Sequence, residues 1–289
     1  MAQDPRSTCP VCDRKGNKRH AVVDGLDYFE CKNCECLFLQ ADLITEIDAG
    51  KSIRKYDDKY WARELKSSRH RSYGSSLARV AEVLYYARSP VKNFIDIGTG
   101  AGYLLDSLAY HLPSQTSTFY GVEMYPPDQV QSAHPNYLKG RIGDLGKTFQ
   151  AGSCIEVVEH LTPAMLRLIA QELAAVSDPQ AAYIFNTGLA HFVKSKKPDY
   201  LDPYRRGHIM SYSIKAAKLI FEPHGFKMFP IRGKDWAFYA EYQSKASTSE
   251  DITQRVWSAL PENMSILDDP KSGTVMQILG RESIRAYLR

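Results

Sequence analysis

The stretch Asn93-Phe94-Ile95-Asp96-Ile97-Gly98-Thr99-Gly100-Ala101-Gly102-Tyr103-Leu104-Leu105 decides the fold class. Phe94–Ile97 predict a buried strand, and a helical pattern follows the glycines to about Leu112. Glycines between a strand and a helix allow a tight turn and let backbone N–H groups approach a ligand closely. A dinucleotide fingerprint would need a glycine where the chain has Tyr103. The loop therefore predicts an α/β protein whose ligand is not a dinucleotide.

Acidic residues follow this loop along the chain. Residues Thr118–Val122 predict a second strand, and Glu123 stands at its end, 21 residues after Gly102. A carboxylate at this place can accept hydrogen bonds from both hydroxyls of a ribose. Gly143-Asp144-Leu145 comes next, and a short fourth strand is expected near Ser153–Ile155.

The segment Glu156-Val157-Val158-Glu159-His160 gathers side chains that can carry chemistry. If a helix begins at about Glu156, then Glu156, Glu159 and His160 stand at i, i+3 and i+4. They would share one face at the carboxyl edge of the sheet. Two carboxylates and an imidazole there could bind a divalent cation, or could form a base with its orienting acid.

The rest of the chain completes the α/β pattern. Apolar residues at helical spacing from Leu77 to Ala87 predict a helix before the glycine loop. After the Glu-His segment we expect a strand over Ala182–Asn186, a helix over Ile214–Phe221, and strands over Phe226–Ile231 and Trp236–Tyr242. The last residues are interpreted as a capping extension, with an oligomerisation element or a lid as the alternative.

Five of the six cysteines lie in the first 36 residues, which predicts a zinc ribbon. Each Cys-x-x-Cys turn aims two thiolates at one Zn²⁺, and the expected ligands are Cys9, Cys12, Cys31 and Cys34. Cys36 could replace Cys34. Short strands over 21–23 and 28–29, with Gly25 in the turn between them, would complete a module that bound metal helps to fold. Disulfide-bonded or redox-active cysteines are the alternative, which a cytoplasmic location disfavours.

The composition predicts a folded chain with one large domain and an appendage, because 44% of the 289 residues are hydrophobic and 24% are charged. The net charge of +4 is too small to require nucleic acid as a partner. No apolar run approaches the roughly 18 residues of a membrane helix, and the first residues lack the apolar stretch of a signal peptide. We expect a cytoplasmic protein without a membrane span and leave its oligomeric state open.

A polar linker joins the cysteine module to the central domain. Between Lys51 and Arg79 nine Lys and Arg stand against three acids. We interpret this run as a solvated helix face, with contact to phosphates or an anionic glycan as the alternative; Tyr56 and Tyr60-Trp61 could pack over a ligand. The expected organisation is a zinc-ribbon module (1–40), a linker with entry helices (41–75), a central domain (76–243) and a C-terminal extension (244–289).

The order of motifs over 76–243 resembles that of the class I S-adenosylmethionine-dependent methyltransferases. The resemblance implies a Rossmann-like, doubly wound sheet of seven strands, mostly parallel, with an antiparallel last strand. It implies S-adenosylmethionine (SAM) as cofactor, with its methionine end admitted by Gly98, Gly100 and Gly102. In this family Asp96 would help to hold the ammonium group, Glu123 the ribose and Asp144 the amine of the adenine.

The Glu-x-x-Glu-His segment looks like that of the ubiquinone-pathway O-methyltransferases and the small-RNA 2′-O-methyltransferases. In both groups a later histidine completes a Mg²⁺ site beside the accepting hydroxyls, and His208 stands at the matching place. The resemblance therefore implies Mg²⁺ or Mn²⁺ on Glu156, Glu159, His160 and His208. Without a metal, His160 would take the proton directly; in either case Glu159, His160 and His208 are the expected catalytic residues.

The whole plan of ribbon, Tyr-x-x-x-Tyr-Trp linker and domain resembles the bacterial zinc-ribbon methyltransferases that modify sugars and polysaccharides. It implies that a carbohydrate hydroxyl, free, nucleotide-linked or in a glycan, accepts the methyl group. An RNA methyltransferase, C- or N-methylation of a sugar, and a non-catalytic binding module are the alternatives. The modest charge disfavours RNA, and the intact glycine loop and acids disfavour a module without activity.

Overall fold

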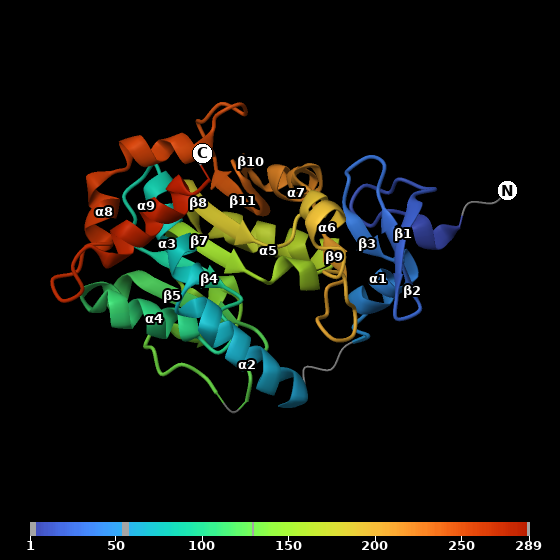
Figure 1. Cartoon of the computed structure of the whole chain (residues 1–289), viewed down its shortest axis with the longest axis horizontal. Coiled ribbons are helices and arrows are strands. Elements are labelled where there is room, and N and C mark those ends of the chain that lie inside the picture. Colours follow the sequence, from blue (N-terminus) through green and yellow to red (C-terminus); the bar gives the residue numbers. More distant parts are fainter. Residues whose placement is uncertain (1–3, 54–57, 129, 288–289) are drawn as a thin grey trace.

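The computed structural model describes residues 4–53, 58–128 and 130–287, so Tyr56 of the predicted linker lies outside the described residues. It contains a seven-stranded sheet in the middle of the molecule and a four-stranded sheet at the N-terminal end (Figure 1). Among the described residues no helix is long and apolar enough to cross a membrane.

The central sheet is the sheet that the glycine loop predicted. Its order is β10-β11-β8-β7-β4-β5-β6, and β11 alone runs antiparallel to its neighbours. The Rossmann-like, mostly parallel sheet with an antiparallel last strand is therefore confirmed. Its strands are β4 (Phe94–Ile97), β5 (Phe119–Glu123), β6 (Tyr137–Lys139), β7 (Phe149–Ile155), β8 (Ser177–Asn186), β10 (Phe226–Ile231) and β11 (Lys234–Tyr242).

Helices cover both faces of this sheet and bury two separate apolar clusters. One face is covered by α3 (Ser75–Tyr86), α4 (Tyr103–His111) and, outside α3, α9 (Val275–Arg285). The other is covered by α5 (Pro163–Ala175) and α7 (Ile214–Phe221). The remaining helices are α1 (Ala41–Asp48), α2 (Asp58–Ser72), α6 (Ala190–Lys196) and α8 (Pro261–Ile266).

The cysteine module forms a second sheet in the order β1-β2-β3-β9. A hairpin joins β1 (Lys18–Val23) to β2 (Leu26–Glu30), and Gly25 turns it with φ of 80°. The third strand, β3 (Leu37–Leu39), pairs with β9 (Met210–Ser211), which belongs to the distant segment between α6 and α7. The fourth strand of the small sheet is therefore supplied by the part of the chain that builds the large one.

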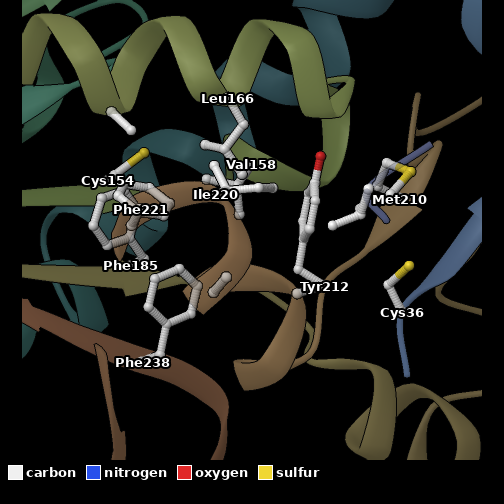
Figure 2. Close-up of a cluster of buried hydrophobic side chains, with 14 of the residues drawn as sticks. Cys36, Cys154, Val158, Leu166, Phe185, Met210, Tyr212, Ile220, Phe221 and Phe238 are labelled. Carbon is white, nitrogen blue, oxygen red and sulfur yellow. The ribbon is translucent and has the colours of Figure 1, made fainter. Parts of the chain in front are cut away.

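One buried cluster runs without interruption from the large sheet into the cysteine module. Figure 2 shows part of it, with the rings of Phe185, Phe221 and Phe238 on one side, Cys36 on the other and Tyr212 between them. The cysteine module and the central domain therefore share a core, and the apolar surface buried in it stabilises the contact between them.

Candidate active site

The glycine loop lies at the carboxyl end of β4 and begins α4. All three of its glycines adopt positive φ, at 70° for Gly98, 60° for Gly100 and 82° for Gly102, a conformation that other residues reach only with strain. A Cβ at Gly98 would lie 2.6 Å from Val157 Cγ2, whereas a Cβ at Gly100 would meet nothing within 4 Å. One end of the loop is therefore packed against the segment after β7, and its middle is open to a ligand.

Two acidic side chains face this loop. Glu123 ends β5, and its carboxylate accepts hydrogen bonds from the backbone N–H groups of Gly100 (3.0 Å) and Tyr125 (2.9 Å). Asp96 is buried on β4 and accepts a hydrogen bond from the Ser153 hydroxyl at 2.7 Å. Burial raises the pKa of Asp96 to about 6, so its charge depends on what lies beside it.

A small cleft opens beside the loop, and α2 forms one of its walls. It is lined by Ser68, Arg71, Ser72, Ser76, Asp96, Gly98, Thr99, Leu104 and Ile155. Arg71 is the one basic side chain of this lining, and it also pairs with Glu64, with Nη2 2.7 Å from Oε1. The interpretation of the basic run as a solvated face missed Arg71, because a single sequence cannot show which turn of a helix reaches a cleft.

Asp144 lies in the short 3-10 turn η3 (Ile142–Leu145), after β6. One of its oxygens, Oδ2, accepts a hydrogen bond from the backbone N–H of Arg141 at 2.7 Å. This bond closes the turn, so Asp144 has a structural role; its contact with adenine stays a prediction.

The reactive cluster consists of Glu159, His160 and His208, each of which brings a ligand atom within 4.8 Å of the other two. Glu159 has no exposed surface, and neither of its carboxylate oxygens accepts a hydrogen bond of ordinary geometry in the described part of the chain, although the side chains of Thr187 and Tyr200 lie near it. His208 Nε2 lies 3.9 Å from Glu159 Oε1. A buried carboxylate without partners is costly, and a cation would supply what it lacks.

The two histidine rings are oriented by backbone carbonyls. His160 Nδ1 lies 3.1 Å from the carbonyl oxygen of Gly207, and His208 Nδ1 lies 2.8 Å from that of Tyr200. Because a carbonyl only accepts, each Nδ1 carries the proton, and the neutral ring has its lone pair on Nε2. Metal-binding histidines in proteins are commonly fixed in this way.

The electrostatics of the cluster favour uncharged side chains in the absence of a cation. Burial, and then the neighbouring carboxyl of Glu156, raises the pKa of Glu159 well above its ordinary range. Burial, and then His160, lowers the pKa of His208 to about 3. The lowered pKa of His208 leaves the neutral imidazole that a metal binds, whereas the carboxylate form of Glu159 would need the positive charge of a bound cation.

The expectation of a helix from Glu156 was wrong. Glu156 directly follows β7 with φ of 57°, and only the 3-10 turn η4 (Val158–His160) comes after it. Its Oε1 accepts a hydrogen bond from Asn186 Nδ2 at 2.7 Å. The chain must reverse sharply at the end of a parallel strand, so Glu156 is turned toward β8 and is not one of the three residues that converge.

Four cysteines converge in the N-terminal module. Each Sγ atom of this group lies within 4.8 Å of the others, and the members are Cys9, Cys12, Cys31 and Cys34. The Sγ of Cys36 is also near, 3.4 Å from that of Cys34 and 3.7 Å from that of Cys9. Hydrogen bonding to Cys36 lowers the pKa of Cys31 and Cys34 to about 6, which favours the thiolates that Zn²⁺ binds.

The methyltransferase domain family matches residues 65–230, more than half of the chain, and the chain belongs to this family. It is a SAM-dependent methyltransferase. The match begins inside α2, the helix that forms one wall of the cleft beside the glycine loop.

Solved structures with a similar fold include several methyltransferases. A SAM-bound amino pentose methyltransferase from Micromonospora echinaspora is 18% identical, with a TM-score of 0.45, over 65% of this chain and 98% of that one. A sugar N-methyltransferase from Streptoalloteichus is 12% identical, with a TM-score of 0.46, over 63% and 92%. Magnesium protoporphyrin IX methyltransferase from Synechocystis PCC 6803 is 16% identical, with a TM-score of 0.42, over 64% and 93%. No curated protein matches the chain. These likenesses are distant, and nothing about the acceptor of this chain follows from them.

Proposed function

We propose that this enzyme methylates a hydroxyl of a carbohydrate, with a divalent cation held by Glu159, His160 and His208. One observation carries the proposal: the buried Glu159 carboxylate makes no hydrogen bond of ordinary geometry in the described structure, and it lies close enough to the His160 and His208 imidazoles for one cation to contact all three. The cluster is also next to the cofactor loop, because Val157, two residues before Glu159, packs on Gly98.

The residues at the cleft fit SAM. Asp96 supplies a carboxylate for the ammonium group of its methionine end, and Glu123 one for its ribose. Arg71 supplies a positive charge in the same cleft as Asp96, and we assign it to the methionine carboxylate. Bound there, SAM supplies a methyl group on a positively charged sulfur. The residues of the loop and α2 hold its two ends, and the open Gly100 admits it without a clash.

The cluster would orient the acceptor and prepare its oxygen. A hydroxyl is a poor nucleophile while it keeps its proton, and a divalent cation there lowers the pKa of the hydroxyl that it contacts. Glu159, His160 and His208 would hold that cation, and Glu156 lies near enough to Glu159 to influence its charge. In-line transfer then depends on alignment of oxygen, carbon and sulfur, which the contact between Val157 and Gly98 helps to fix.

A second route needs only His160. With Nδ1 held by the carbonyl of Gly207, the basic Nε2 can accept the hydroxyl proton. The C–O bond forms as the C–S bond breaks, and the thioether leaves neutral. The two routes differ in their response to chelation.

The choice of a carbohydrate rests on the resemblance of the whole chain plan to the sugar-modifying zinc-ribbon enzymes, and on chemistry. Sugars offer neighbouring hydroxyls, which suit a cation held by three residues and therefore open to further oxygen ligands. For the ribbon we propose Zn²⁺ on Cys9, Cys12, Cys31 and Cys34. Zn–S bonds of about 2.3 Å place neighbouring sulfurs about 3.8 Å apart, close to the 3.5 Å between Cys12 and Cys31 and the 3.6 Å between Cys9 and Cys34.

The decisive experiment measures transfer of labelled methyl from SAM to a panel of sugars, nucleotide sugars and RNA, with the products identified by mass spectrometry. We expect a methylated sugar hydroxyl, and loss of activity when a mild chelator removes Mg²⁺ or Mn²⁺ while zinc is retained. Full activity after chelation would leave the His160 route. Methylation of RNA alone would refute the carbohydrate proposal.

The matched variants are His160→Ala and His191→Ala. His191 is an exposed histidine on α6, outside the cluster. We expect His160→Ala to reduce kcat at least about a hundredfold and His191→Ala to leave it unchanged. Equal activities of the two variants would remove His160 from the chemistry.

A further inference from the structure

We infer that the cysteine module positions His208 in the active site, through the hydroxyl of Tyr28 and the strand β3. The inference deepens the proposed function and rests on it, because His208 is one of the three residues proposed to hold the cation. On this inference the ribbon contributes to catalysis by holding one of the residues of the active site in place.

The backbone that carries His208 is held by the module. The Tyr28 hydroxyl, fully buried on β2, donates a hydrogen bond to the carbonyl oxygen of His208 at 2.8 Å. The backbone N–H of Leu39 donates to the carbonyl oxygen of Ile209 at 2.9 Å. Directly after these residues, β9 pairs with β3 in the register Leu37↔Ser211 and Phe38↔Met210.

The same backbone is tied on its other side to the second half of the cluster. The N–H of Ile209 donates to the carbonyl oxygen of Glu159 at 3.0 Å. The Tyr212 hydroxyl donates to the carbonyl oxygen of Leu161, the residue after His160, at 2.8 Å. One short segment therefore connects the module to the turn η4, and it sets the 3.9 Å between His208 Nε2 and Glu159 Oε1.

The cysteines stand at the ends of the strands that make these contacts. Cys31 directly follows β2, and Cys36 directly precedes β3. The Ser213 hydroxyl donates to the carbonyl oxygen of Cys34. Figure 2 shows Cys36 beside Met210 and Tyr212, in the cluster that joins the module to the central domain. Metal bound by the cysteines would therefore fix the two strands from which the backbone of His208 is held.

If the module only stabilises the fold, the expected measurements differ from those expected if it positions His208. A module that only stabilises the fold would change the melting temperature and leave the affinity of the cluster for a cation unchanged. A module that positions His208 would change that affinity, because residues that orient metal ligands commonly alter metal binding by about 10- to 100-fold.

The test compares Tyr28→Phe with Tyr183→Phe. Both remove one buried hydroxyl; that of Tyr183 pairs with the hydroxyl of Ser177 at 2.7 Å, at the far end of β8. Mn²⁺ is titrated into each full-length variant and followed by electron paramagnetic resonance, with SAM affinity measured by calorimetry and zinc content by atomic absorption. We expect Tyr28→Phe to weaken Mn²⁺ binding about tenfold or more, with SAM affinity and zinc content unchanged, and Tyr183→Phe to bind Mn²⁺ as the native chain does.

A second measurement does not depend on the cation. The imidazole nitrogen resonances of His208 are recorded in ¹⁵N-histidine-labelled protein and assigned by their loss in His208→Asn. We expect Tyr28→Phe to shift these resonances and Tyr183→Phe to leave them in place. Unshifted His208 resonances together with native Mn²⁺ affinity in Tyr28→Phe would overturn the inference. If the native chain takes up no Mn²⁺, the proposed cation site fails, and the His208 resonances alone decide the inference.

Discussion

At the scale of single residues, the charge of Asp96 is controlled by its burial on β4. A protonated Asp96 cannot pair with the ammonium group of SAM. Its pKa of about 6 therefore predicts that SAM affinity rises about tenfold per pH unit below pH 6 and levels off above pH 7. Calorimetry between pH 5 and 8 measures this, and Asp96→Asn should bind SAM weakly without a step near pH 6. A step of the same size in Asp96→Asn would assign it to another group.

The same residue affects the stability of the protein without ligand, with the opposite sign. Because the folded-state pKa of Asp96 is raised above the ordinary 3.8, the unfolded chain releases this proton first. Its contribution to the free energy of unfolding is thus fully present below about pH 4 and is lost as the pH rises through 6. Binding strength and the stability of the empty protein change in opposite directions over that interval.

Replacing Arg71 should affect binding of the methionine end of SAM and not binding of its nucleoside end. If Arg71 meets the methionine carboxylate, Arg71→Ala should weaken SAM binding about tenfold or more, since a hydrogen bond to a charged group contributes about 1.5 to 3 kcal/mol. It should leave binding of methylthioadenosine, which lacks the amino acid end, unchanged. Calorimetry with both ligands tests this, and Arg63→Ala, exposed on the same helix, is the matched control. Equal losses for both ligands would contradict the assignment.

At the scale of elements, substitutions in the cysteine module can show which thiols bind metal. Cys34, not Cys36, belongs to the four sulfurs that lie within 4.8 Å of one another. The pKa of Cys36 is raised, first by the hydrogen bonds that its thiol donates to neighbouring cysteines, which favours a protonated thiol beside the site. We predict that Cys34→Ser loses zinc and melts at a lower temperature, and that Cys36→Ser keeps one zinc per chain. Atomic absorption measures the zinc, and the reverse pattern would exchange the two roles.

The elements differ in how far the sequence predicted them. Strand β4, the helix after the loop, α7 and the hairpin of β10 and β11 have strong local patterns, and the structure confirms them. The prediction of a helix after β7 was wrong because the residues of Glu-x-x-Glu-His have the same sequence spacing whether they form a helix or an irregular turn. The positive φ of Glu156 is imposed by the end of a parallel strand and by Asn186, and neither is visible in the local sequence.

The residues that complete the site come from places where local pattern carries no information. Arg71 and Tyr28 reach the cleft and His208 from other elements, and Tyr28 lies 180 residues from the group that it contacts. His208 itself was found only because its neighbourhood resembles a known arrangement. Of the four residues that the resemblance implied for the cation, Glu159, His160 and His208 converge, and Glu156 is not part of their group.

At the scale of the whole molecule, the C-terminal extension is fastened by buried charge. Arg255 is 3% exposed, and its Nη1 lies 2.8 Å from Oε1 of the buried Glu241 on β11. Removing one partner of such a pair leaves the other charge buried without compensation, which costs about 3 to 5 kcal/mol. We predict that Arg255→Leu lowers the free energy of unfolding by that amount, measured by denaturant titration.

The exposed Arg281 on α9 provides the matched control for this prediction. Arg281→Leu should stay within about 0.5 kcal/mol of the native chain. A small effect of Arg255→Leu would mean that the extension is held by its apolar residues alone, among them Ile252, Leu267 and Met276.

The pairing of β3 with β9 bears on how the chain is made. During synthesis, residues 1–40 leave the ribosome long before β9 is made. Until then, the edge of β3 that pairs with β9 has no partner strand. Such late, long-range pairing is slow, and an uncovered strand edge invites contact with other chains. The small sheet is therefore completed long after its first three strands are made, and a nascent chain that stalls before residue 210 would carry its cysteines in an unfinished sheet.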